Sequence, residues 1–141
     1  MISQLTVFIE NRKGHLACAC RAIADAGINM RALFLADTAD FGIARIFCDR
    51  PEFAAQALRD AGFRAKITPV LAVRIPNQGG CLADLLEFLD SADSNIEYGY
   101  CFSMNDQFAL NVLKVEGPSP ESELLEAGYH IVEPQEVYDL D

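Results

Sequence analysis

The hydrophobic pattern at the start of the chain changes from a strand period to a helix period within about twenty residues. Segment 4–10 (QLTVFIE) alternates apolar and polar residues, as a half-buried β-strand does. Segment 15–27 (HLACACRAIADAG) places its apolar residues at helical spacing and ends on Gly27, a typical C-terminal stop. The pattern therefore predicts a strand, a turn and a helix over 14–26.

The following residues predict two more strands, a second helix and a closing strand. Segments 29–37 and 41–48 read as a strand pair joined by the short hairpin Thr-Ala-Asp. Pro51 suits the first turn of a helix over about 51–61. Segment 63–67 (FRAKI) predicts the closing strand, and Pro69 is expected to mark the join to the next segment.

The second half of the chain repeats the first. A gapless shift of 66 residues aligns identical residues at turns and at periodic apolar positions, including Leu5 with Leu71, Val7 with Val73, Ile9 with Ile75, Asn11 with Asn77, Gly14 with Gly80, Leu16 with Leu82, Asn29 with Asn95 and Gly62 with Gly128. The corresponding elements are a strand at 70–75, a helix at 80–92, strands near 95–103 and 107–115, a helix near 119–127 and a last strand at 129–132.

The order is thus βαββαβ written twice, an α+β class with two ferredoxin-like units in tandem. We assign the first domain to residues 1–69 and the second to residues 70–141. Units of this size bury little core alone. We therefore expect their antiparallel sheets to pack side by side, edge to edge, with the helices on one face.

Composition and charge narrow the class of function. The chain is 51% hydrophobic and 23% charged, which is globular, and its net charge of −10 argues against nucleic acid and against an anionic membrane surface. No apolar run approaches the roughly 18 residues that span a bilayer. The first residues lack the layout of a secretory signal. These features predict a cytoplasmic protein.

No residue pattern indicates catalysis, a metal or a cofactor. The five cysteines include a C-x-C pair, Cys18 and Cys20, without ligands at zinc spacing, and they read as small buried apolar residues. The two histidines have no nucleophile and acid beside them in sequence. The Asp40-Phe41-Gly42 tripeptide is interpreted as a hairpin turn, because the other kinase motifs are missing.

The first strand-to-helix turn of each repeat carries the residues best suited to hold a ligand. A helix N-terminus offers unpaired N–H groups to a carboxylate, and a glycine there permits close approach. Asparagine can both donate and accept, which suits a ligand with ammonium and carboxylate groups. A second asparagine opens the next strand, and we expect it at the same end of the sheet. On geometry alone, glycines that only permit the turn and asparagines that only cap the helix are the favoured alternative explanation of the same residues.

The segment E-N-R-K-G-H-L-A, the later A-G-I-N-M and the duplication resemble the ACT domain, a regulatory module whose members bind amino acids near this turn. Nearly the whole chain is similar to stand-alone tandem ACT-domain proteins. The resemblance implies effector sites at the interface between modules. It implies that one site is lined by Asn11, Gly14, His15, Leu16 and Asn29, and its counterpart by Asn77, Gly80, Cys81, Leu82 and Asn95.

The expected function is therefore a regulatory protein, not an enzyme, that binds a free amino acid. Its other expected partners are a second copy of the chain and an unlinked metabolic enzyme or regulator. The second turn is less basic than the first, since Gln78 and Gly79 replace Arg12 and Lys13, so the two sites are not expected to bind equally. The alternative is an oligomerisation module without a ligand.

Overall fold

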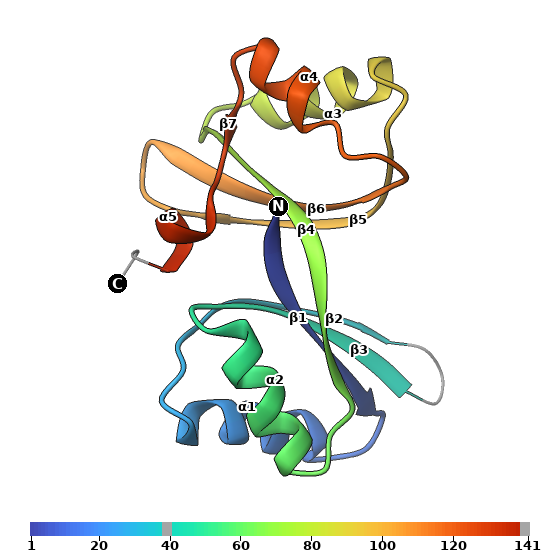
Figure 1. The fold of residues 1–141 in the computed structure, drawn as a ribbon, viewed down its shortest axis with the longest axis vertical. Coiled ribbons are helices and arrows are strands. Elements are labelled where there is room, and N and C mark those ends of the chain that lie inside the picture. The colour runs from blue at the N-terminus through green and yellow to red at the C-terminus, as the bar shows by residue number, and fades with distance from the viewer. Residues whose placement is uncertain (38–40, 139–141) are drawn as a thin grey trace. The chain divides into compact units, whose positions relative to one another are not determined.

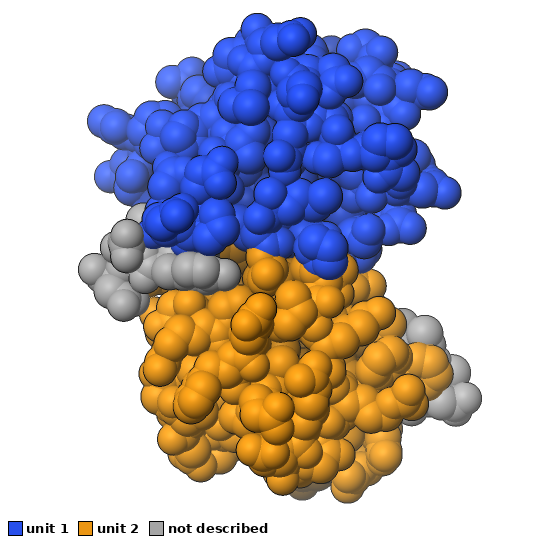
Figure 2. All heavy atoms as spheres, in the orientation of Figure 1, with its two compact units in different colours: residues 1–2, 69–136 blue, residues 3–68, 137–141 orange. Residues whose placement is uncertain are grey.

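The computed structural model describes residues 1–37 and 41–138, and it divides into two compact units. Residues 3–68 form most of the N-terminal unit, orange in Figure 2, and residues 69–136 with residues 1–2 form the C-terminal unit, blue in Figure 2. The Thr-Ala-Asp hairpin, whose Asp40 also begins the Asp-Phe-Gly tripeptide, lies outside the described residues. No helix of the described residues is long and apolar enough to cross a membrane.

The N-terminal unit has the predicted βαββαβ order. Its elements are β1 (Ile2–Glu10), α1 (His15–Asp25), β2 (Met30–Asp37), β3 (Phe41–Cys48), α2 (Pro51–Asp60) and the first part of β4 (Ala65–Pro76). The strands lie in the order β2-β3-β1-β4, and β3 runs antiparallel to both β1 and β2. This is the order of a ferredoxin-like unit.

The C-terminal unit repeats this order. After β4 come α3 (Cys81–Ser91), β5 (Asn95–Ser103), β6 (Phe108–Glu116), α4 (Glu121–Glu126), β7 (His130–Ile131) and α5 (Pro134–Tyr138). Strand β4 pairs with both β6 and β7, and β6 pairs with β5, all antiparallel. The predicted α+β class with two ferredoxin-like units is confirmed, whereas α5 was not predicted.

In each unit two helices cover one face of the sheet (Figure 1). The N-terminal core joins Leu5, Val7 and Ile9 of β1 to residues of α1, α2 and β3, among them Ile23 and Leu58. The C-terminal core repeats this arrangement with Leu71, Val73, Ile75, Leu89 and Leu124. The alternation that predicts the first strand of each repeat is therefore the alternation that builds its core.

Two features of the strands differ from expectation. Segments 63–67 and 70–75 were expected as separate strands, but residues 65–76 form the single strand β4, which begins after Arg64 and continues through Pro69. Proline fixes φ near −65°, which an extended chain accepts, so it does not break the strand.

The gapless repeat also fails at one point. Glu10 pairs with Phe41, whereas its counterpart Pro76 pairs with Phe108, so the hairpin of the C-terminal unit is one residue longer. Phe108 is thus the structural counterpart of Phe41. The expected alignment of Phe41 with Gln107 is wrong by that residue.

Candidate functional site

The two strand-to-helix turns have the same backbone. Gly14 (φ 86°, ψ −12°) and Gly80 (φ 90°, ψ −20°) both adopt the left-handed conformation directly before a helix. The carbonyl of each glycine accepts the first helical hydrogen bond at 2.9 Å, from Cys18 N–H and from Asp84 N–H. Glycine is favoured at both positions because most other residues enter this conformation at a cost.

Both helices begin directly after a left-handed glycine. A glycine at the N-cap supplies no capping side chain to the N–H groups of the first turn. The first of these, on His15 and on Cys81, donates to the backbone carbonyl of Arg12 and of Gln78 at 3.3 Å. No heavy atom lies within 4 Å of the position that a Cβ would take on Gly14 or Gly80. The side chains of Asn11 and Asn77, in the same turns, are both exposed.

His15 is held in a fixed orientation at the N-terminal turn. Its Nδ1 accepts a hydrogen bond of 2.7 Å from the backbone N–H of Glu10, and its ring stacks on Phe63 with 4.9 Å between centroids. A neutral ring that accepts through Nδ1 carries its proton on Nε2. Thus His15 presents one N–H donor away from the strand. Its neighbour Leu16 instead packs against the core.

A cavity of about 360 Å³ adjoins this turn. Its walls include Phe8, Phe41, Phe63 and Arg64 in addition to His15. The Arg64 guanidinium lies 5.2 Å from the centroid of the Phe8 ring and forms no ion pair with any residue that the structure describes. A cationic group and an aromatic surface thus meet beside the open end of α1.

Sequence reasoning missed these cavity residues because they come from separate elements. Phe8 lies on β1, Phe41 on β3, and Phe63 and Arg64 in the connection between α2 and β4. The only local signal is the Phe-Arg dipeptide that follows Gly62. Their convergence depends on the strand order, which single-sequence patterns do not give.

The C-terminal turn has different side chains on the same backbone. Cys81 takes the place of His15, and Tyr129, which contacts Phe88 at 5.5 Å, takes the place of Phe63. Burial raises the pKa of Tyr129, with smaller contributions from Asp84 and Cys81. His130 stands where Arg64 stands and lies 2.7 Å from the Glu136 carboxylate of α5. This turn therefore lacks the free guanidinium of the N-terminal one.

The expected convergence of the asparagines is wrong. Strand β2 runs parallel to β1, because both are antiparallel to β3, so Asn29 precedes β2 at the end of the sheet opposite Asn11. The separation is the length of eight-residue β3, about 26 Å. Helix α1 carries the chain back along the sheet before β2 begins.

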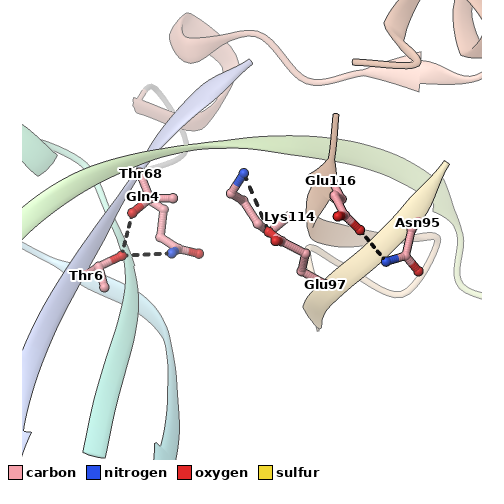
Figure 3. Close-up of polar contacts among 7 residues, drawn as sticks. All are labelled: Gln4, Thr6, Thr68, Asn95, Glu97, Lys114 and Glu116. Atoms are coloured by element: carbon pink, nitrogen blue, oxygen red, sulfur yellow. Dashed lines mark hydrogen bonds and ion pairs between the residues drawn. The ribbon is translucent and has the colours of Figure 1, made fainter. Parts of the chain in front are cut away.

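The same topology separates Asn95 from Asn77. Asn77 lies next to Gln107, whereas Asn95 pairs with Glu116 at the other end of β6. Figure 3 shows the Asn95 Nδ2 donating to the Glu116 carboxylate, at 2.8 Å. Within one unit, neither Asn29 nor Asn95 can contact a ligand held at the turn.

The cysteines of the described part of the chain differ in their burial. Only Cys48 is buried, which corrects the expectation for all five, since Cys18 and Cys101 are exposed. Burial raises the pKa of the Cys48 thiol to about 11. No group of three or more His, Cys, Asp or Glu residues that could hold a metal occurs within residues 1–37 and 41–138.

Comparison with known proteins agrees with this architecture. A family model described as the ACT domain pair matches residues 1–137. The crystal structure of protein BT0572 from Bacteroides thetaiotaomicron is similar with a TM-score of 0.90 and 35% identity, covering 97% of this chain and 95% of that chain. No curated protein matches the sequence.

Two more distant structures share the fold. The ligand-free regulatory subunit of aspartate kinase from Thermus thermophilus has a TM-score of 0.64 and 19% identity, covering 89% of this chain and 86% of that chain. The regulatory subunit of aspartate kinase from Thermus flavus has a TM-score of 0.59 and 17% identity, covering 98% of this chain and 91% of that chain. At these identities the likeness concerns the fold alone.

Proposed function

The chain belongs to the family of ACT domain pairs, and from that premise we propose that it is a regulatory protein that binds a free amino acid at its strand-to-helix turns. The observation that carries the proposal is the pair of helix N-termini behind left-handed Gly14 and Gly80, because a glycine N-cap supplies no side chain to the first-turn N–H groups. The ligand's carboxylate accepts from the first-turn N–H groups, and the carbonyl of Asn11 or Asn77 holds its ammonium.

The N-terminal turn is the stronger site in this proposal. The cavity beside it supplies the Arg64 guanidinium, the Nε2 donor of His15 and aromatic walls, whereas the counterpart of Arg64 is engaged with Glu136 in the C-terminal unit. The two sites therefore differ in affinity. We place the two domains at residues 1–69 and 70–141, and we assign the protein no catalytic activity of its own.

The test begins with a thermal-shift screen against the twenty amino acids, followed by calorimetric titration with each one that stabilises the protein. Asn11→Ala removes one hydrogen bond to a charged group, worth about 1.5–3 kcal/mol, and should weaken binding about tenfold to a hundredfold. Asn77→Ala should affect the second, weaker site. Gln56→Ala, an exposed change on α2, serves as the control. Unchanged affinity in Asn11→Ala and Asn77→Ala would place the ligand elsewhere.

Asn29→Ala decides whether one unit is enough to form the N-terminal site. Asn29 lies far from the turn of its own unit, so binding within one unit leaves the affinity of this variant unchanged. Weakened binding in Asn29→Ala would mean that another module brings its asparagine to the turn, as in a homodimer. Sedimentation of Asn29→Ala with and without the amino acid shows whether the variant is a monomer or a homodimer when the ligand binds.

Edge strand β2 supports self-association as a second function. Leu33, Phe34 and Leu35 are 42%, 37% and 42% exposed on a strand at the end of the sheet order. Apolar edge strands are natural surfaces for pairing with another chain. We therefore propose a homodimer, and a Leu35→Lys variant that sediments like the parent protein would argue against this edge as its interface.

A further inference from the structure

The C-terminal unit contains a cavity of about 250 Å³ beside α3. Leu82 and Leu86 of α3 form one wall, and Gly99, Cys101 and Asn111 of β5 and β6 contribute to the other. Among the residues that the structure describes, no Asp, Glu, Lys, Arg or His side chain lines it. Only Leu82 belongs to the residues that the sequence singled out.

The internal repeat explains why this space exists. By strand register, Gly99 pairs with Leu113 as Leu33 pairs with Ile46 in the N-terminal unit. In the same way, Cys101 pairs with Asn111 as Leu35 pairs with Ala44. Two leucines of the N-terminal unit are therefore replaced by a glycine and a cysteine. The loss of side-chain volume opens the cavity on the face that α3 covers.

The same comparison identifies an unusual residue in the wall of the cavity. Asn111 pairs with Val73 as Ala44 pairs with Val7, so a buried alanine of one unit is a buried asparagine in the other. Asn111 is 3% exposed, and its Nδ2 has no hydrogen-bond partner among the described residues. Buried donors without a partner are rare and costly in folded proteins. The cavity thus has apolar walls and one unpaired donor.

We infer that this cavity binds the side chain of a neutral amino acid that combines an aliphatic body with one hydrogen-bond acceptor, such as a hydroxyl, thioether or amide oxygen. The inference rests on the proposed function, because Leu82 follows the turn at which the backbone of the ligand binds. At about 30 Å³ per water-sized group, the volume holds about eight non-hydrogen atoms, which is enough for any aliphatic side chain. Charged side chains are excluded because no counter-charge lines the cavity.

Threonine and valine are the probes, because they differ only by a hydroxyl in place of a methyl group. Calorimetric titration of the parent protein should show threonine binding about tenfold more tightly than valine at the weaker, C-terminal site, the effect of one hydrogen bond to Asn111. Asn111→Ala removes the donor and introduces the residue of the other unit, so the threonine preference should disappear. Lysine and glutamate should not bind at this site.

Cys101→Leu is the matched variant that restores the packing of the other unit. It should abolish the binding of both probes at this site while the thermal unfolding midpoint is kept, since Leu35 occupies the same position in the N-terminal unit. Gln56→Ala, the exposed change on α2, is its control and should leave the affinity of this site unchanged.

Each other result overturns the inference in a distinguishable way. If amino acids bind but Asn111→Ala and Cys101→Leu change neither affinity nor preference, the cavity is not the site and the proposed function stands. If valine binds the parent protein as tightly as threonine, Asn111 does not recognise the ligand. If none of the twenty amino acids binds, the inference and the proposed function fail together.

Discussion

Adjacent Gly79 and Gly80 allow the cost of the left-handed turn to be measured separately from any steric effect. Only Gly80 has a positive φ, 90°, and neither glycine has a heavy atom within 4 Å of a built Cβ. The added methyl group of Gly80→Ala therefore meets no obstacle, and its cost is the backbone strain of about 1–2 kcal/mol. The smaller entropy of the unfolded alanine chain offsets about 0.4–1 kcal/mol of this.

We therefore expect Gly80→Ala to lower the free energy of unfolding by about 1 kcal/mol, and Gly79→Ala to leave it unchanged or raise it slightly. Urea titration followed by far-ultraviolet circular dichroism suits a chain without tryptophan. A slope of about 2 kcal/mol/M would turn this loss into a shift of about 0.5 M in the midpoint. Gly80→Asn should recover part of it, because asparagine tolerates this conformation. Equal midpoints for the two alanine variants would refute the assignment of strain to Gly80.

Three further predictions concern the core, a thiol and a carboxylate. Leu124 is fully buried, so Leu124→Ala should lower the free energy of unfolding by about 2–5 kcal/mol. The side chain of Leu125 is 59% exposed, so Leu125→Ala should change the free energy of unfolding by less than about 0.5 kcal/mol. Equal urea midpoints for the two variants would contradict this prediction. Burial raises the pKa of Cys48 to about 11, so near pH 9.0 iodoacetamide should alkylate exposed Cys18 and spare Cys48 until urea unfolds the chain, as peptide mass analysis would show. The backbone N–H of Glu133 is the main cause that lowers the pKa of Glu136 in the folded protein. The ionised carboxylate therefore stabilises the fold above pH 4.5, and this stabilisation is lost as the pH falls through the lower folded pKa. Glu136→Gln should remove this part of the pH dependence of the urea midpoint, and an unchanged pH profile would argue against a stabilising role for Glu136.

The sequence predicts most of the fold because the residues that begin and end its helices act locally. Gly27 and Gly62 end the first two helices with positive φ, and Pro51 begins the second, so these boundaries can be placed within a residue or two. Pro69 misled the prediction because a proline in a strand and a proline at a join look alike in sequence. The extra hairpin residue before Phe108 is likewise invisible until the strand register is known.

The site was less predictable because it depends on where the ends of elements meet. The turns at Gly14 and Gly80 follow from local pattern, but the position of Asn29 requires the direction of β2. An α-helix of eleven residues advances the chain about 16 Å, which takes it away from the turn. Asn111 gave one usable signal, a polar residue inside the apolar run Phe-Ala-Leu-Asn-Val-Leu, on the face where alternation places core residues.

Strand β4 has a consequence for how such a pair can evolve. The boundary between the units falls between Thr68 and Pro69, inside a strand of twelve residues that gives the last strand of one repeat and the first of the next. Gene rearrangements usually join or separate domains at exposed linkers, where a cut leaves each core intact. Here a cut at the boundary would shorten a sheet strand in both repeats. We therefore expect the two repeats to be inherited together as one segment of the gene, and to diverge by substitutions within each repeat.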